Sequence, residues 1–173
     1  ALDVDQNGDV WLTGMTASLN FPTQNGGGYF QGGNAGVADG FVLKFDNNGN
    51  RLHASYFGGN LHDEGYDLHV DLTGSVWITG TTQSANLPTQ NIGSFFQATN
   101  GGSFDAYILK FDGTANLQFG TYYGGSQNDF AMNITSDQTG NLWVLGETES
   151  PNLPTLDGGA YFQPNLAGTR DQF

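Results

Sequence analysis

Four side chains near the N-terminus carry oxygen atoms at a spacing that could bind calcium. Asp3, Asp5, Asn7 and Asp9 occupy alternating positions, and Gly8 stands at the sixth place of the run. This pattern matches the first half of an EF-hand loop, whose carboxylate and amide oxygens are ligands that Ca²⁺ prefers. The alternative is a tight hairpin turn, in which Gly8 adopts a positive φ and Asp5 accepts hydrogen bonds from its own backbone.

A second group of titratable side chains could bind a metal or supply an acid and a base for hydrolysis. Its members lie close together in the sequence: His53, His62, Asp63, Glu64, Asp67 and His69. Their spacing matches no motif with a known mechanism, and the sequence holds no nucleophile elbow, phosphate-binding glycine loop or HExxH. We therefore favour surface variation over catalysis, and predict no catalytic residues.

An internal repeat organises the chain. Trp11, Trp77 and Trp143 are separated by 66 residues each, and the prolines at 22, 88 and 154 keep the same period. Aligning residues 1–41 with 67–107 and 133–173 gives 14 of 41 columns identical in all three copies. The predicted copies are 1–66, 67–132 and a partial 133–173. Such a period indicates an array of one supersecondary unit.

The repeat also bears on the calcium hypothesis. The segments that correspond to residues 3–11 are HVDLTGSVW (69–77) and TSDQTGNLW (135–143), which keep only the columns of Asp5 and Gly8. A turn is therefore what the repeat requires. A calcium site stays open for the first copy, which alone has Asp3 and Asp9.

Each copy contains four short runs rich in β-branched and aromatic residues, separated by Gly, Asn and Asp. We expect strands at 2–5, 10–16, 40–46, 51–57, 66–71, 75–82, 106–112, 117–123, 130–136 and 141–148, and no helix longer than about two turns. The run VWITG at 76–80 is apolar on both faces, which indicates coverage by a sheet on each side. The sequence therefore predicts an all-β fold of tandem four-stranded antiparallel β-propeller blades, with each Trp between adjacent sheets. A β-solenoid is the alternative, but its coils are shorter.

A long connection joins the second and third strands of each copy, as at residues 16–38. Pro22, Thr23, Gly27, Phe30 and Gln31 recur at the same offsets in every copy. The segment is predicted to cover the blade or seal it to its neighbour, with Tyr29 and Phe30 buried. The alternative is a recognition surface for a sugar chain.

Asp63 and Asp129 follow Gly-Gly turns at equal offsets. They could form a ring of carboxylates near a central channel and hold a cation, or each could cap the preceding turn. We favour the caps.

Composition excludes several classes of partner. The chain has 173 residues, no cysteine, four basic against seventeen acidic residues and a net charge of −13. Such a surface repels phosphate backbones and anionic headgroups, so we expect no nucleic-acid binding. No apolar run reaches the length of a membrane helix, so we expect no membrane insertion.

The recurring motifs carry a family resemblance. GNLWVLGET (140–148), NLPT (152–155), YFQ (161–163), DAYILKFD (105–112) and TYYGG (121–125) resemble the bacterial β-propeller repeat called SBBP. The resemblance covers essentially the whole chain. It implies four-stranded blades in exported or cell-surface proteins, and it implies no particular reaction.

These observations predict a non-enzymatic scaffold or adhesion module, extracellular or on the cell surface, that binds glycans or surface proteins. The alternative is a propeller enzyme or accessory domain that acts on extracellular polysaccharide. The chain holds about 2.6 repeats of 66 residues, whereas propellers close with roughly 4 to 8 blades. We therefore expect an incomplete ring that packs against further repeats of its own chain or against identical copies. No cofactor is expected apart from the calcium candidate.

Overall fold

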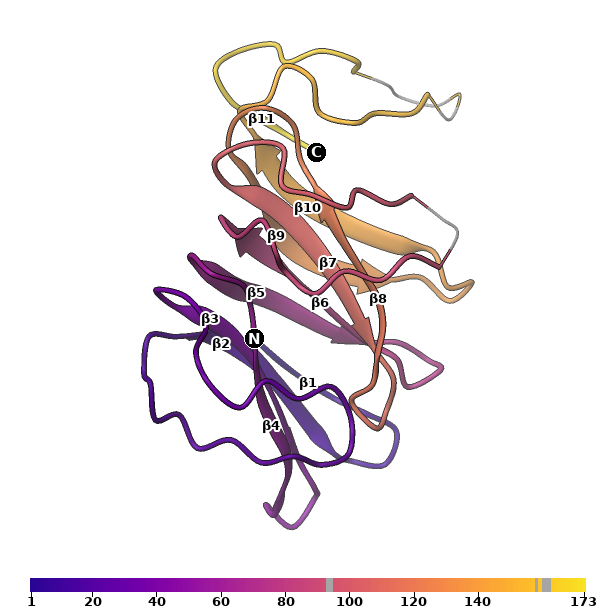
Figure 1. Ribbon diagram of the computed structural model, residues 1–173. Coiled ribbons are helices and arrows are strands. Elements are labelled where there is room, and N and C mark those ends of the chain that lie inside the picture. Colours follow the sequence, from indigo (N-terminus) through magenta and orange to yellow (C-terminus); the bar gives the residue numbers. More distant parts are fainter. Residues whose placement is uncertain (93–94, 158, 160–162) are drawn as a thin grey trace.

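The protein is built from strands throughout the part of the chain that the structure describes. The computed structural model describes residues 1–92, 95–157, 159 and 163–173, and within these ranges it contains no helix. Three antiparallel sheets follow one another in chain order (Figure 1). The predicted all-β class is confirmed. The sheets do not form a closed ring.

Each sheet is a simple up-and-down arrangement of consecutive strands. Sheet 1 has the order β1-β2-β3-β4, sheet 2 has β5-β6-β7-β8, and sheet 3 has β11-β10-β9. The strands of sheet 1 are β1 (Leu2–Val4), β2 (Val10–Thr16), β3 (Asp39–Phe45) and β4 (Arg51–Phe57). Those of sheet 2 are β5 (Asp63–Val70), β6 (Val76–Thr82), β7 (Asp105–Phe111) and β8 (Leu117–Tyr123). Those of sheet 3 are β9 (Asp129–Ser136), β10 (Leu142–Thr148) and β11 (Asp171–Gln172).

The predicted strands agree with these bounds to within one residue, except at β5. That strand begins at Asp63 instead of residue 66. Its early start has a packing cause, because Glu64 and Gly65 pair with Thr81 and Gly80 of β6. Gly65 also lies against sheet 1, where an added Cβ would come within 2.3 Å of Thr13 Oγ1. The close approach of the two sheets therefore requires glycine at this position of the strand.

One turn motif closes five hairpins. It is an Asp whose Oδ1 accepts backbone N–H bonds from the second and fourth residues that follow, at Asp5, Asp46, Asp71, Asp112 and Asp137. The third residue after the Asp has a positive φ, 82° at Gly8 and 64° at Ala115. The turn predicted at residues 3–11 is thus confirmed as a repeated device.

The three equivalent tryptophans show how the sheets stack. Trp11 is 0% exposed, Trp77 is partly buried and Trp143 is 61% exposed. The backbone context is the same in each copy, and every indole N–H donates to the Asp of its own turn. What differs is the sheet that follows: sheet 2 has four strands, sheet 3 has three, and no described sheet covers Trp143. The expectation that every Trp lies between sheets is confirmed for Trp11 and wrong for Trp143.

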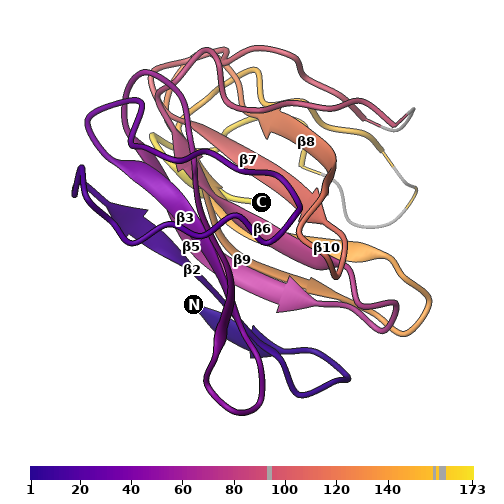
Figure 2. The same ribbon diagram turned by 60° about the horizontal axis from the view of Figure 1, so that its bottom comes forward.

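The sheets pack face to face as successive layers (Figures 1 and 2). Their first strands β1, β5 and β9 lie next to one another, and β5 and β9 also contact the second strands β2 and β6 of the preceding sheets. The core between sheets 1 and 2 joins Trp11, Val42 and Phe57 to Val76 and Ile78. Apolar residues on both faces of β6 are therefore explained by a neighbour on each side.

The long connections of sheets 1 and 2 run along the outer edge of their own sheet. Gln24 pairs with Ala54 and Gln31 with Tyr56 of β4, and equivalent bridges join Gln90 and Gln97 to β8. The ring of Tyr29 packs on that of Phe111 in sheet 2, with 6.1 Å between the ring centroids. Phe30, in contrast, is 41% exposed. These segments cover the edge strands and contact the next sheet, which protects unpaired backbone groups. The predicted burial of Phe30 is wrong, because its side chain remains exposed to solvent.

The tryptophan series gives a matched test of sheet stacking. Trp11→Ala should destabilise the protein by about 3–5 kcal/mol, since it empties a fully buried site. Trp143→Ala, at the equivalent but exposed position, should cost much less. Urea denaturation of the two variants measures the difference, and equal losses would contradict the stacking of sheet 2 on the Trp11 face.

Candidate functional site

The four predicted calcium ligands do not converge. Asp5 uses Oδ1 to close its turn and Oδ2 to accept the indole N–H of Trp11 at 3.2 Å. Asp3 points to the neighbouring sheet, where its Oδ2 accepts the backbone N–H of Val70 at 2.8 Å. Asn7 lies in the same turn as Asp5 and donates its backbone N–H to Asp5 Oδ1. This geometry gives the calcium hypothesis no shared coordination centre.

A lysine occupies the space beside two of these carboxylates. Lys44 Nζ lies 2.9 Å from Asp9 Oδ2 and 3.7 Å from Asp5 Oδ2, and 4.9 Å from the centroid of the Trp11 ring. Its ammonium supplies locally the positive charge that a cation would bring. In sheet 2, Lys110 repeats the contact with Trp77 at 4.8 Å. Both lysines therefore have a structural role, as cations stacked on the repeated tryptophan beside its turn.

The histidine-rich group around residues 53–69 is also dispersed. His53 is 2% exposed, its Nδ1 accepts the backbone N–H of Gly26, and burial lowers its pKa. The imidazole of His62 contacts the carboxylate of Glu64 and, among the described residues, makes no ion pair with another member of the group. Asp67 reaches sheet 3, where its Oδ2 accepts the backbone N–H of Ile134 at 2.9 Å. Within the described residues, no three His, Asp or Glu side chains gather as a metal site.

One part of this group forms a chain that sequence reasoning missed. His69 Nε2 lies 2.9 Å from Ser136 Oγ, and His69 Nδ1 lies 3.4 Å from Asp3 Oδ2. The three residues come from β1, β5 and β9, the adjacent first strands of the three sheets. Ser136 borders a cleft of about 140 Å³ between the turns that begin at Asp71 and Asp137. Asp3 and His69 are equivalent positions of the repeat, and this equivalence could have pointed to their pairing. Ser136 lies one position after the third equivalent residue, Thr135, so the repeat gave no sign of its part in the contact.

The junctions between sheets are the most regular polar feature. Asp63 Oδ2 accepts the backbone N–H of Gly59 at 2.7 Å and the hydroxyl of Ser84 at 2.8 Å. Asp129 makes the same two contacts with Gly125 and Ser150. Both aspartates are 0% exposed. They cap Gly-Gly turns, as the favoured reading predicted, and do not line an open channel.

A second buried carboxylate faces each cap. An added Cβ at Gly58 would lie 2.8 Å from Asp39 Cγ and 2.9 Å from Asp63 Oδ2, so both carboxyl groups border this glycine. At the next junction, burial and the nearby charge of Asp129 raise the pKa of Asp105 to about 6, against opposing bonds from Gly101, Gly102 and Gln97. Burial likewise raises the pKa of Asp39. Asp39 Oδ1 and Asp129 Oδ1 have no hydrogen-bond partner among the described residues.

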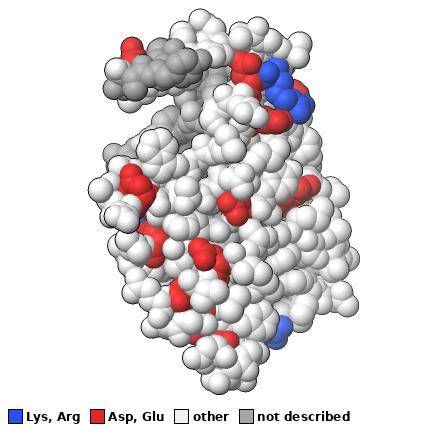
Figure 3. Space-filling view, turned by 180° about the vertical axis from the view of Figure 1, so that it is seen from behind, with Lys and Arg blue, Asp and Glu red and all other residues white. Residues whose placement is uncertain are grey.

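Charge on the surface is predominantly negative. Carboxylates are scattered over the face seen in Figure 3, while basic side chains occupy small patches. Arg170 forms ion pairs with two glutamates: its guanidinium lies 3.0 Å from Glu147 Oε2 and also pairs with Glu149. Within the described part of the chain, no helix is long and apolar enough to cross a membrane.

Comparison with known proteins finds a relative of low sequence identity. No family model matches the chain. The regulatory protein FlaEY of Caulobacter vibrioides is 28% identical over 119 residues, which cover 69% of this chain. The match spans 12% of the length of that curated relative. The resemblance to SBBP repeats therefore stays a prediction.

The buried carboxylate pairs predict a stability maximum at mildly acidic pH. Asp105, with its folded pKa of about 6, binds a proton more tightly when folded, so stability should fall as pH rises from about 4 to 6, by up to ~3 kcal/mol. Below about pH 4 the turn carboxylates, whose pKa values are lowered at Asp5, Asp71 and Asp112, lose their own contribution. Melting temperatures across pH 3–8 measure this, and Asp105→Asn should flatten the slope between pH 4 and 6. A maximum at or above pH 7 would contradict the argument.

Proposed function

We propose that the chain is a non-catalytic repeat scaffold, exported or displayed at the cell surface, whose sheets are successive blades of a β-propeller. The recurrence of one junction carries this proposal. Between sheets 1 and 2, and again between sheets 2 and 3, a Gly-Gly turn is capped by a buried Asp that bonds a Ser of the following sheet. An array joined in this way can add units without a new kind of contact.

A second set of contacts supports the same reading. Asn86 Oδ1 accepts the backbone N–H of Asn60 at 2.9 Å, and Asn152 Oδ1 accepts that of Ser126 at 2.9 Å. Asn86 and Asn152 belong to long connections of the following sheets. The connections after β6 and β10 thus help to fix the preceding junctions. We propose that their exposed side chains contact a protein or glycan partner. Repetition of such a surface gives avidity to weak contacts.

Surface display and adhesion can be tested together in the organism that makes the chain. Antibodies against residues 1–173 should label intact cells, and brief protease treatment should remove the label. The purified protein should be retained on isolated envelope polysaccharide or envelope protein. Label that appears only after the cells are lysed would contradict the proposed location, and loss of retention on both materials would contradict adhesion.

A second candidate function is hydrolysis of esters on extracellular polysaccharide, and the Ser136–His69–Asp3 chain favours it. The hydroxyl, imidazole and carboxylate stand in the order of a catalytic triad. Ser136 Oγ would attack the carbonyl carbon of an acyl ester and pass its proton to His69 Nε2. The proton would leave with the sugar alcohol, and water would then release the acid from the serine ester. The cleft of about 140 Å³ beside Ser136 suits a small acyl group.

The hydrolase reading has a direct chemical test. A fluorophosphonate should modify Ser136 and leave the exposed Ser126 unmodified, as read by peptide mass spectrometry. His69→Gln should reduce the labelling rate and the hydrolysis of p-nitrophenyl acetate by about 100-fold or more, because the general base is lost. Equal labelling of the variant and wild type would assign the Ser136–His69–Asp3 chain to structural bridging between sheets.

A further inference from the structure

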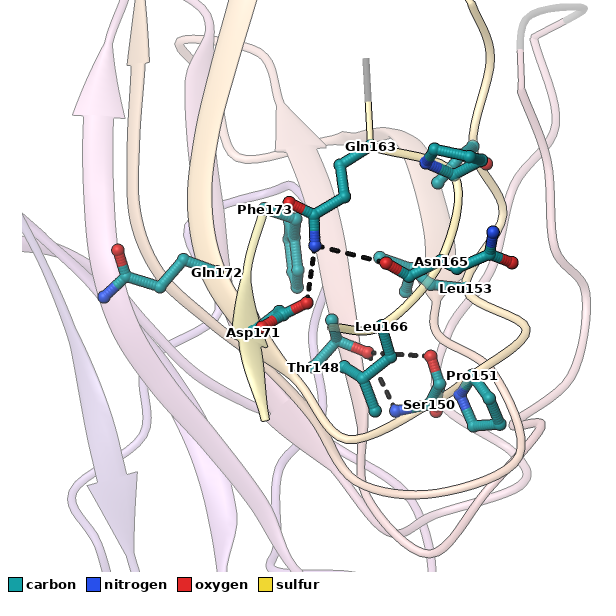
Figure 4. A pocket seen from close by; sticks show the side chains of 12 residues that line it. Thr148, Ser150, Pro151, Leu153, Gln163, Asn165, Leu166, Asp171, Gln172 and Phe173 are labelled. Carbon is teal, nitrogen blue, oxygen red and sulfur yellow. Dashed lines mark hydrogen bonds between the residues drawn. The ribbon is translucent and has the colours of Figure 1, made fainter. Parts of the chain in front are cut away.

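The cleft of about 200 Å³ beside β11 has a lining that recurs elsewhere in the protein (Figure 4). Its walls include Ser150, Leu153, Gln163 and Phe173. Residues at the equivalent positions in sheet 2 are Ser84, Leu87, Gln97 and Tyr107, and those in sheet 1 are Ser18, Phe21, Gln31 and Phe41. In those two sheets the corresponding space has a defined occupant.

That occupant is a tyrosine of the fourth strand. In sheet 2 the hydroxyl of Tyr122 donates to Ser84 O at 2.8 Å and accepts the backbone N–H of Leu87 at 2.8 Å. The backbone N–H of Tyr122 donates to Gln97 O at 3.1 Å, and Tyr122 stands opposite Tyr107 in the ladder.

Sheet 1 repeats every one of these contacts. Tyr56 bonds Ser18 O, Phe21 N and Gln31 O, and it pairs with Phe41. Both tyrosines are 0% exposed. Two independent copies thus define one binding mode for the phenol ring, the hydroxyl and the backbone.

The cleft of sheet 3 presents the same groups in the same chain order. Leu153 N and Ser150 O, the two atoms that a tyrosine hydroxyl bridges in the other sheets, here form a long bond of 3.4 Å with each other. Gln163 Nε2 donates to Asp171 Oδ2 at 2.7 Å, as Gln97 does to Asp105 at 2.8 Å. The Gln–Asp bond that accompanies each bound tyrosine is therefore already made.

The residues on either side of the tyrosine indicate which residue types the ligand strand must carry at those positions. Ser55 and Thr121 precede the two tyrosines, and their hydroxyls accept the backbone N–H of Gln31 and Gln97. Two residues after the tyrosine, a Cβ on Gly124 would lie 2.5 Å from Asp105 Cγ. Asp171 is the equivalent of Asp105, so only glycine fits at that point of the ligand.

We propose that the cleft between Ser150 and Phe173 is a binding site for a tyrosine-bearing β-strand of a further repeat, with the sequence hydroxyl residue–Tyr–aromatic–Gly–Gly. The strand adds antiparallel to the edge of β11 that pairs with no described strand. Its tyrosine lies opposite Phe173, in the register of β7 with β8. This is strand addition to a sheet edge, in which backbone bonds give affinity and a side-chain pocket gives specificity. The inference rests on the repeat scaffold proposed above, and it names the contact by which sheet 3 joins a further repeat.

A synthetic peptide tests the site on the 173-residue protein. The probe is residues 116–125 of this chain, NLQFGTYYGG, with a fluorophore at its N-terminus, and binding is read by fluorescence anisotropy. Tyr122→Phe in the peptide should weaken binding about tenfold, because the bridging hydroxyl is lost. Tyr123→Phe is the matched control and should bind as the parent does, since Phe57 holds that position in sheet 1. Gly124→Ala should abolish binding.

The outcomes separate this inference from the proposed function. Equal binding of the Tyr122→Phe and Tyr123→Phe peptides, or no binding of the parent, would overturn the tyrosine site even if the protein is displayed on cells. Selective loss with Tyr122→Phe and Gly124→Ala supports it even if display fails. Amide chemical shifts that move at Leu153, Gln163 and Phe173 would place the peptide in the cleft.

Discussion

The contact on which the rest of the structure depends is the face-to-face packing of one sheet on the next. A four-stranded sheet of this size has two apolar faces and cannot bury both by itself. Trp11, Trp77 and Trp143 have the same local structure, yet their exposure rises in that order as the following sheet has four, three and no described strands. Burial of the repeated side chains is therefore a property of the array and not of the individual sheet.

The polar junctions determine the geometry of that packing. Apolar faces alone would allow sheets to slide, whereas Asp63 and Asp129, at the starts of β5 and β9, bond the Gly-Gly turn that leads in from the preceding sheet. Two carboxyl groups border Gly58, and the charge of Asp129 acts on the buried Asp105. Such pairs cost stability above the raised pKa of Asp105. The same capping contacts recur at both junctions.

Most side chains that could carry out chemistry are engaged in this architecture. Asp5 closes a turn, Lys44 neutralises Asp9 beside a tryptophan, and His53 is buried. The Ser136–His69–Asp3 chain differs, because it borders a cleft and lies on three first strands. The reactivity of Ser136 distinguishes a purely structural scaffold from a hydrolase. The cleft at Phe173 bears on the proposed assembly with further repeats.

The sequence by itself determined the strands, the repeat and the turns, because these depend on alternation, period and local hydrogen bonds within a few residues. Asp5 and Gly8 could be assigned to a turn because their columns recur in every copy. Only the tertiary structure decided which side chains meet across sheets. It sent Asp3 to Val70 and His69, placed Gly65 against Thr13, and left Phe30 outside the core. Such contacts join residues about 50 to 70 positions apart through the packing of whole sheets, so no local pattern encodes them.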